Sequence, residues 1–357
     1  MTDSSAAAQR SAVIAVSGSI PATLDDDIAG GTRPRADYRV LAEHLSGELL
    51  DYDTAISSLG RTGRVLSRIF GKNVALAVAL HRRGRHVTDV FTDGEQVGLP
   101  YAALSRFRRK RPRHHMIVHI MSVPKKTLLF RTLKLRPLID NYFVYASRQV
   151  NALRELGVEE RRIHLTSFMV DSRFFASTEI EVARRRMICS AGLEQRDYET
   201  LLAAVDGLDV DVVLAAASPW SRRRSTVDER AIPANVTVCR LDFVELRRLY
   251  AEAAFVVMPL LDVEFQAGVT TILEAMAMER AVICTRTIGQ TDVIVDGDTG
   301  VYVPPGDVAA LRAAIVRLLE DPDEADRLGS AARRYTTIVA DIDVYAQRLA
   351  EIITSVG

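Results

Sequence analysis

The sequence alternates short apolar runs rich in β-branched residues with longer stretches of helical periodicity, and it does so in two successive series. Strands separated by helices in this way are typical of parallel sheets covered by helices on both faces. The expected strands are 12–17, 87–92, 115–121, 141–145 and 162–167 in the first series, and 187–191, 210–216, 235–239, 254–258, 281–284 and 301–303 in the second. The expected helices are 38–50, 60–83 and 146–156, then 197–206, 243–252, 270–278, 307–320, 322–335 and 342–354. A chain of 357 residues is too long for a domain with one ordinary core, so the two series predict two doubly wound α/β domains.

The two predicted domains meet in a polar stretch without a clear period, 167–185. We therefore expect a Rossmann-like domain over 1–170 and a second one over 171–340. The remaining residues, 341–357, are predicted to form a final helix whose apolar residues are Val344, Leu349, Ile352 and Ile353.

Two features indicate a chain that works in the cytoplasm. It has no run of roughly 18 apolar residues, and its first apolar run is too short for the middle region of a signal peptide. Its cysteines, Cys189, Cys239 and Cys284, are far apart and lack the spacing of a metal site. Buried free thiols in a reducing compartment are the simplest interpretation.

The net charge of zero conceals a strong asymmetry. Residues 1–168 hold 26 Lys and Arg against 16 Asp and Glu, whereas the remainder holds 20 against 30. Between 100 and 139 there are 11 basic residues and no acidic one, and Leu128, Leu129, Leu133 and Phe130 would share one side of a helix there. Such a segment could lie on an anionic membrane surface, or it could be a core-facing helix with a solvated basic face. Nucleic acid is disfavoured as a partner because no known binding module accompanies the charge.

The most informative stretch is a buried strand, a loop and a helix between 255 and 277. A helix that begins beyond the carboxyl end of a strand offers free N–H groups and a dipole that favour a phosphate. Gly268 would let the backbone approach a ligand, and Thr270 and Thr271 add hydroxyl donors. Glu274, one turn into the helix, could accept hydrogen bonds from ribose hydroxyls. The plainer alternative is a capped helix with an exposed glutamate.

This stretch resembles the signature of glycosyltransferase family 4, in which a Glu, seven residues and a second Glu precede Ala-Met-Ala. Here the two positions are Gln266 and Glu274, followed by Ala-Met-Ala at 275–277. The flanking segments 246–259, 281–284, 289–292, 296–307, 318–322 and 328–329 are similar to the family as well. The resemblance covers roughly 140–335 and is strongest from 246 onward.

The resemblance implies the GT-B fold, with two Rossmann-like domains, a cleft between them, and a C-terminal helix that packs back on the N-terminal domain. It implies a retaining glycosyltransferase that moves a sugar from a UDP- or GDP-linked donor to an acceptor hydroxyl, without a metal. The second domain would hold the donor, and the first would hold a glycan, lipid or small-molecule acceptor, with the protein cytoplasmic or peripheral on the inner face of the membrane. A sugar-nucleotide epimerase and a non-catalytic nucleotide-sugar binding protein remain alternatives.

The sequence departs from the family at two places. Gln266 replaces the first Glu of the pair, and Glu264 either compensates for it or is a solvated loop residue. Leu193 replaces a usual Arg after the first strand of the second domain, and Arg196 is the expected substitute for the family's phosphate-binding Lys. The alternative for Arg196 is a cap or an ion pair with Asp197. The cluster Arg222, Arg223 and Arg224 could also reach donor phosphate, or form a solvated loop.

The resemblance assigns catalytic roles to His119, Gln266 and Arg196. Donor contacts are expected at Gly30, Gly31, Gly192, Arg196, Arg240, Leu241, Gln266, Ala267, Gly268, Val269, Thr270 and Glu274. Glu95 and His119 are the expected acceptor contacts. Two of these have plain alternatives, because Gly30-Gly31 is ordinary turn chemistry and a lone His on a strand is often a hydrogen-bonded core residue.

Overall fold

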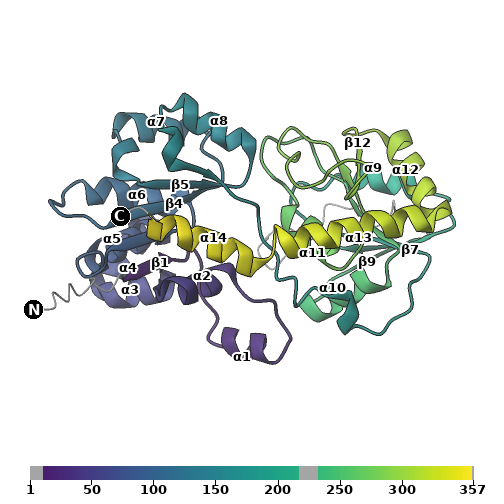
Figure 1. The fold of residues 1–357 in the computed structure, drawn as a ribbon, viewed down its shortest axis with the longest axis horizontal. Helices are drawn as coiled ribbons and strands as arrows, with labels where there is room; N and C mark the ends of the chain where they lie inside the picture. The colour runs from purple at the N-terminus through teal and green to yellow at the C-terminus, as the bar shows by residue number, and fades with distance from the viewer. Residues whose placement is uncertain (1–10, 217–231, 356–357) are drawn as a thin grey trace, which may run out of the picture. The chain divides into compact units, whose positions relative to one another are not determined.

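The computed structural model describes residues 11–216 and 232–355, and the chain divides into two compact units (Figure 1). The N-terminal unit contains residues up to Leu24, Ala36–Thr166 and Ala346 onward, and the C-terminal unit contains Asp25–Arg35 and Ser167–Tyr345. The sequence-based division at 170/171 lies near the observed one. The grouping of Asp25–Arg35 with the C-terminal unit was not expected, because a short excursion of the chain has no signature in its composition.

The N-terminal unit is built on a six-stranded parallel sheet of order β2-β1-β3-β4-β5-β6. Its strands are β1 (Ala12–Ala15), β2 (Glu48–Leu50), β3 (Asp89–Thr92), β4 (Arg113–Val118), β5 (Asn141–Val144) and β6 (Ile163–Leu165). The prediction of a helix over 38–50 is wrong at its end, since α2 (Asp37–Leu45) stops there and β2 follows. Gly47 permits this turn, because a Cβ at that position would lie 2.4 Å from Ile14 Cδ1.

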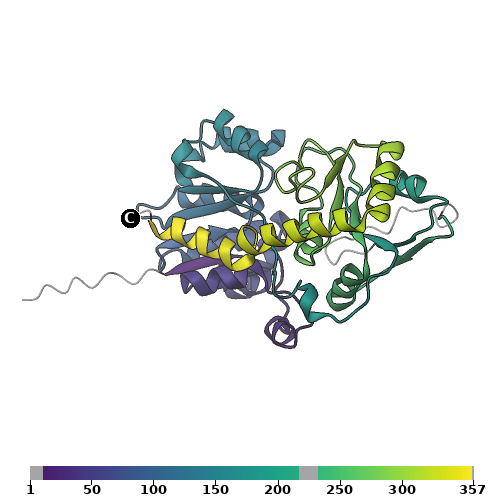
Figure 2. The ribbon, with the colours of Figure 1, turned by 45° about the vertical axis from the view of Figure 1, so that its right-hand side comes forward.

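Helices cover both faces of this sheet (Figures 1 and 2). Besides α2 they are α3 (Tyr52–Leu59), α4 (Arg61–Phe70), α5 (Lys72–Arg83), α6 (Glu95–Ser105), α7 (Pro124–Thr132) and α8 (Ser147–Glu155). The prediction of a single helix over 60–83 is wrong, because the helix is interrupted at Gly71, whose φ is +88°. In α7, Phe130 packs into the core while Leu128, Leu129 and Leu133 face solvent, so the four apolar residues do not share one side.

The C-terminal unit holds a second six-stranded parallel sheet, of order β12-β11-β10-β7-β8-β9. Its strands are β7 (Met187–Ala191), β8 (Asp211–Ala215), β9 (Val236–Cys239), β10 (Phe255–Met258), β11 (Val282–Thr285) and β12 (Val301–Val303). Its helices are α9 (Tyr198–Val205), α10 (Phe243–Glu252), α11 (Val269–Ala277), α12 (Val308–Glu320) and α13 (Pro322–Ile338), together with α1 (Leu24–Ala29) from the excursion. The prediction of two doubly wound α/β domains is therefore confirmed.

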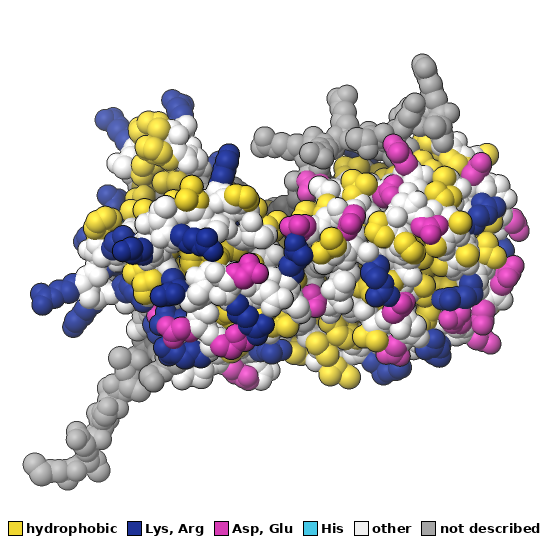
Figure 3. All heavy atoms as spheres, turned by 90° about the horizontal axis from the view of Figure 1, so that it is seen from above, with side chains coloured by type: hydrophobic (Ala, Val, Ile, Leu, Met, Phe, Trp, Pro, Cys, Tyr) yellow, Lys and Arg dark blue, Asp and Glu magenta, His cyan; other side chains and the backbone are white. Residues whose placement is uncertain are grey.

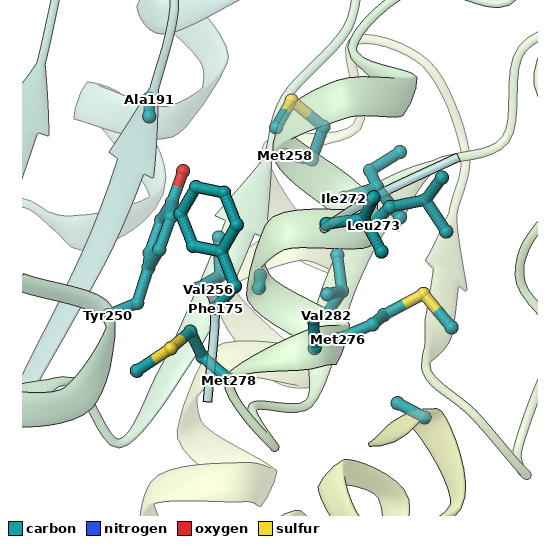
Figure 4. Close-up of a cluster of buried hydrophobic side chains, with 14 of the residues drawn as sticks. Phe175, Ala191, Tyr250, Val256, Met258, Ile272, Leu273, Met276, Met278 and Val282 are labelled. Carbon is teal, nitrogen blue, oxygen red and sulfur yellow. The ribbon is translucent and has the colours of Figure 1, made fainter. Parts of the chain in front are cut away.

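Helix α11 lies within the core of the C-terminal unit. Its residues from Thr271 to Ala277 are all buried, and their neighbours come from α10, β10 and β11. Figure 4 shows Ile272, Leu273 and Met276 along this helix, with Val256 and Met258 of β10 and Tyr250 of α10 in the same cluster. Dense packing of this kind fixes the start of the helix firmly relative to the strands.

The last helix, α14 (Ile342–Ser355), crosses from one unit to the other. Its first residues belong to the C-terminal unit, and the part from Ala346 onward belongs to the N-terminal unit, with Leu349 and Ile353 buried. Within residues 11–216 and 232–355, no helix combines the length and the apolar character needed to cross a bilayer.

Candidate functional site

The C-terminal unit has a topological switch point between β7 and β10. The chain leaves β7 toward β8 and β9 on one side of the sheet, and it leaves β10 toward β11 and β12 on the other. In doubly wound sheets, ligands bind beyond the carboxyl ends of the two strands at such a point. The loops that follow β7 and β10 are joined here, because Asp197 N–H donates to Pro259 O (3.1 Å) and Leu261 N–H donates to Gln195 O (3.0 Å).

The loop after β7 carries Arg196, whose guanidinium is held by backbone carbonyls. Its Nε donates to Ala191 O (2.9 Å) and its Nη1 donates to Glu194 O (2.8 Å). Asp197 is occupied elsewhere, since it caps α9 by accepting hydrogen bonds from the Thr200 N–H and hydroxyl. Among the described residues, no carboxylate lies within 4.0 Å of the Arg196 guanidinium. The structure thus argues against the ion pair with Asp197 and leaves a cation at the switch point.

Two glycines make room for this guanidinium. Gly192 has a φ of +94°, and a Cβ there would lie 2.5 Å from Arg196 Nη2. Gly268 has a φ of +73°, and a Cβ there would lie 3.3 Å from Arg196 Nη1 and 3.0 Å from Met258 Sδ. The left-handed backbone and the close approach both favour glycine. The structure therefore brings three predicted donor contacts, Gly192, Arg196 and Gly268, into one place.

Gly268 is also the N-cap of α11, and no side chain caps the helix. The first bond into this helix is donated by Ile272 N–H to Gly268 O (3.0 Å). The N–H groups of the first turn, including those of Val269 and Thr270, are thus available to an anion, and the helix dipole favours one. Thr271 is buried whereas Thr270 is exposed, so of the two predicted hydroxyl donors the one that can meet a ligand at this helix start is Thr270.

Glu274 lies one turn further into α11 and is 6% exposed. The Tyr250 hydroxyl of α10 donates a hydrogen bond to its Oε2 (3.1 Å). Burial raises the pKa of Glu274 to about 7, and the Tyr250 hydroxyl and the positive charge of Arg196 oppose that rise. The alternative of an exposed glutamate on a capped helix is wrong. A buried carboxylate that titrates near neutral pH is typical of a functional site.

The remaining donor contacts predicted on the β10–α11 loop surround the helix start. Gln266 is half-buried and Ala267 is buried, with the Ala267 carbonyl accepting a hydrogen bond from Gln290 Nε2 (3.1 Å). Glu264 is exposed. These positions fit the predicted loop, and the roles of Gln266 and Glu264 toward a sugar stay predictions.

The other predicted donor contacts lie further from the β10–α11 loop along the sequence. Arg240 is exposed and Leu241 is half-buried, directly after β9 and before α10. Gly30 and Gly31 follow α1, a helix that the sequence did not reveal, and lie in the excursion that groups with the C-terminal unit. The predicted cluster Arg222–Arg224 lies outside the described residues.

The N-terminal unit has its own switch point, between β1 and β3. Ser17 follows β1 and Asp93 follows β3, and the Ser17 N–H and hydroxyl both donate to Asp93 Oδ2 (2.6 and 2.8 Å). Burial raises the pKa of Asp93 to about 6 despite these two donors. Asp37, at the start of α2, has its pKa raised by burial as well and interacts electrostatically with His119.

His119 follows β4 and belongs to the same group of side chains. It is exposed, its Nε2 lies 2.9 Å from Asp93 O, and its ring lies 5.7 Å from that of Tyr145. The core alternative for His119 is therefore wrong. The sequence analysis did not identify Asp93 or Asp37. A carboxylate directly after an apolar strand could have indicated Asp93, but that pattern was assigned to Glu95 instead.

Glu95 begins α6 and is buried. It accepts hydrogen bonds from the His119 N–H (3.0 Å), the Ile120 N–H (3.3 Å) and Lys126 Nζ (2.6 Å). Its carboxylate is thus occupied by donors from its own unit, and it fixes the loop that carries His119. Direct contact between Glu95 and an acceptor stays a prediction that this geometry does not favour.

The comparisons with known proteins bear first on the C-terminal unit. Residues 184–321 match the family model described as glycosyl transferases group 1. The MMP alpha-(1->4)-mannosyltransferase of Mycolicibacterium hassiacum is 30% identical over 190 residues, which are 51% of this chain and 46% of the relative. A glycogen synthase of Mycobacterium tuberculosis is 32% identical over 123 residues, or 34% of this chain and 29% of the relative. The chain spans less than half the length of these curated relatives.

Solved structures resemble both units together. Sucrose-phosphate synthase from Thermosynechococcus elongatus has a TM-score of 0.71 and 16% identity, covering 97% of this chain and 98% of that chain. Anabaena HepE, solved in complex with UDP and glucose, has a TM-score of 0.67 and 13% identity, covering 97% and 99%. These similarities confirm the predicted GT-B fold class. The narrower assignment to family 4 stays a prediction.

Proposed function

We propose that this protein is a retaining glycosyltransferase that moves a sugar from a nucleoside-diphosphate sugar to an acceptor hydroxyl. The observation that carries the proposal is the pairing of Arg196 with the start of α11 at the switch point of the C-terminal unit. A guanidinium that has no carboxylate partner in the described part of the chain and a row of free N–H groups are the groups that a diphosphate needs. The similarity of 184–321 to glycosyl transferases supports the same conclusion.

In this proposal the donor lies mainly on the C-terminal unit. The diphosphate would face the first turn of α11, with Arg196 adding positive charge, and Glu274 would accept hydrogen bonds from the ribose hydroxyls. Gly268 would permit the close approach, and Gln266 would contact the sugar. Arg240 and Leu241 would lie against the base. These contacts do not distinguish UDP from GDP.

The chemistry would consist mostly of stabilising the departing diphosphate. Negative charge grows on the leaving oxygen as the sugar–phosphate bond breaks, and fixed donors at that position lower the barrier. Arg196 and the α11 N–H groups supply such donors without a metal. The acceptor hydroxyl would attack from the same face as the departing phosphate, which retains the anomeric configuration without an enzyme nucleophile.

The N-terminal unit would bind the acceptor in this proposal. Its exposed His119, fixed by Glu95 and by the Asp93 carbonyl, is the side chain best placed to contact a sugar or an acceptor. The free thiols, of which Cys189 and Cys284 are buried and Cys239 is half-buried, support a reducing, cytoplasmic location.

The test is incubation with a panel of nucleotide sugars and a lipid extract. Transfer of sugar with retained configuration supports the proposal, interconversion of donors indicates an epimerase, and binding without turnover indicates a binding protein. A prior comparison of thermal stabilisation by UDP and by GDP identifies the donor class, because a ligand of the native state raises the unfolding temperature. Absence of stabilisation by either nucleotide contradicts the proposed donor site.

A further inference from the structure

Helix α4 of the N-terminal unit carries apolar side chains that face solvent. Val65 is 55% exposed, Ile69 is 65% exposed and Phe70 is 63% exposed. Three arginines of the same helix are exposed as well, and we define the α4 face as Arg61, Arg64, Val65, Arg68, Ile69 and Phe70. Single exposed apolar residues are common, but three together in ten residues, next to three arginines, are not explained by the fold.

The charge around the α4 face has one sign. Residues 54–88 contain seven Lys and Arg and no Asp or Glu. Among the described residues, no carboxylate lies within 4.0 Å of the side-chain nitrogens of Arg61, Arg64 or Arg68. A surface helix usually gains stability from ion pairs three or four residues apart, and α4 lacks the acidic residues to form them.

The inward side of α4 is closely fitted to the unit, so the outward side is not the result of a loose helix. A Cβ on Gly63 would lie 2.4 Å from Ile56 O of α3, which shows how near the two helices are. Leu66 packs against the core, and Gly60 and Gly71, both with positive φ, end the helix on either side. The fold therefore presents the exposed apolar residues in a fixed place.

We infer that the α4 face is a docking surface for an anionic lipid bilayer. Apolar side chains enter the acyl boundary while neighbouring Arg side chains meet the phosphate headgroups, which is the arrangement of interfacial helices. A second copy of the chain fits less well, because a symmetric dimer through this surface would place its arginines against each other. No acidic residue of α4 would relieve that repulsion.

The C-terminal end of α4 lies near the switch point of the same unit. Lys72, two residues beyond Phe70, lies over the ring of Tyr52 (5.5 Å), and the Tyr52 N–H donates to Gly18 O (3.0 Å) in the loop after β1. That loop also holds Ser17, which binds Asp93. Docking would therefore bring the edge of the unit that we assign to the acceptor close to the lipid. This last step, which makes the acceptor a membrane amphiphile, depends on the proposed function.

The docking is tested by flotation of the full chain with vesicles of phosphatidylcholine, with or without phosphatidylglycerol, at low and high salt. We expect binding to the anionic vesicles only, weakened by salt. Arg64→Glu with Arg68→Glu should weaken it by at least about tenfold, from the contribution of each basic residue near the surface. Val65→Gln, Ile69→Gln and Phe70→Gln together should also weaken binding. The binding that remains should be more sensitive to salt than that of the wild type.

Two variants with the same change of charge serve as comparisons. Arg334→Glu with Arg348→Glu, on exposed positions of α13 and α14, should leave vesicle binding unchanged. Lys125→Glu with Arg131→Glu tests the other basic surface, on α7. Unchanged binding by both α4 variants overturns the inference, and so does a dimer in solution that the triple Gln variant converts to a monomer without affecting vesicles. Stabilisation by UDP or GDP is measured on every variant, so that loss of the donor site is distinguished from loss of docking.

Discussion

The switch points of the two units have opposite chemistry. In the C-terminal unit the β7 and β10 loops place a guanidinium beside a helix N-terminus, whereas in the N-terminal unit the β1 and β3 loops place the carboxylate of Asp93 beside Ser17. The net charges run the other way, since residues 1–168 are basic and the rest are acidic, as the distribution of Lys and Arg over the face in Figure 3 also shows. The charge of a site is thus set by a few oriented groups at the strand ends, and the charge of the domain describes its surface.

The largest effect is expected at the cation. Arg196→Ala removes the guanidinium that faces the proposed diphosphate, and transfer should fall by about a hundredfold to a thousandfold, as for the loss of one preorganised donor. Arg196→Lys should recover part of the rate because the charge remains. Rates are measured with the nucleotide sugar that the panel identifies. The exposed Arg248→Ala, which only breaks a pair with Glu252, is the matched control and should be near wild type. A fully active Arg196→Ala variant would remove the contrast between the two switch points.

The next effect is expected at Glu274. Glu274→Gln keeps the shape and the bond from Tyr250 but removes the charge, so nucleotide affinity should fall by on the order of tenfold to a hundredfold. The same change should stabilise the fold at high pH. The pKa of Glu274 is raised to about 7 by burial, so the wild type loses stability as the pH rises from about 4.5 to 7. The Gln variant should not lose it.

Calorimetric affinity for UDP and GDP, and urea unfolding at acidic and alkaline pH, measure both consequences of Glu274→Gln. Wild type and variant should have similar free energies of unfolding at the acidic end, should diverge as the pH rises from about 4.5 to 7, and should differ by a constant amount at higher pH. A parallel pH dependence of the two proteins would show that Glu274 is not the group that titrates.

A smaller effect is expected at Asp93 in the N-terminal unit. Asp93→Asn retains an oxygen that can accept from Ser17, so the fold should persist, and transfer should fall by about tenfold at neutral pH. Burial raises the pKa of Asp93 to about 6, so a limb of the wild-type rate profile should lie there and vanish in the variant. The profile of kcat/KM against pH measures this. A limb that survives in Asp93→Asn belongs to another group.

The smallest effects compare one glycine from each switch point. Gly268→Ala places a Cβ 3.0 Å from Met258 Sδ at a φ of +73°, and should cost about 1–2 kcal/mol of unfolding free energy. Gly18→Ala meets no atom within 4 Å, and its φ is not positive, so it should be close to neutral. Chemical unfolding of both variants checks the pair. Equal costs would mean that the close approach at Gly268 does not constrain the loop.

The sequence allowed the class of fold and the C-terminal switch point to be predicted, because apolar strands of a parallel sheet read as short continuous runs and the β10–α11 segment is dense with informative residues. It did not reveal that Tyr250, 24 residues from Glu274, would be the partner of that carboxylate. Such pairs are fixed by packing between helices.

The misses in the N-terminal unit have local causes. Helical periodicity continues through Gly71, and only its positive φ ends α4. β2 is three residues long and follows a helix with few turn-forming residues between them. Asp93 stands two residues from Glu95, and periodicity alone does not tell which of the two neighbouring carboxylates is paired with Lys126 and which accepts hydrogen bonds from Ser17.

Helix α14 and the excursion Asp25–Arg35 mean that each unit incorporates a segment from the other side of the main division. During synthesis the N-terminal unit would leave the ribosome without the helix that contributes Leu349 and Ile353 to its packing. It would remain incomplete until α14 emerges, although domains usually fold in the order of synthesis. Neither unit is therefore expected to fold normally when it is expressed as one contiguous fragment. A stop codon before 346 should destabilise the N-terminal unit, which is the part of the protein that is translated first.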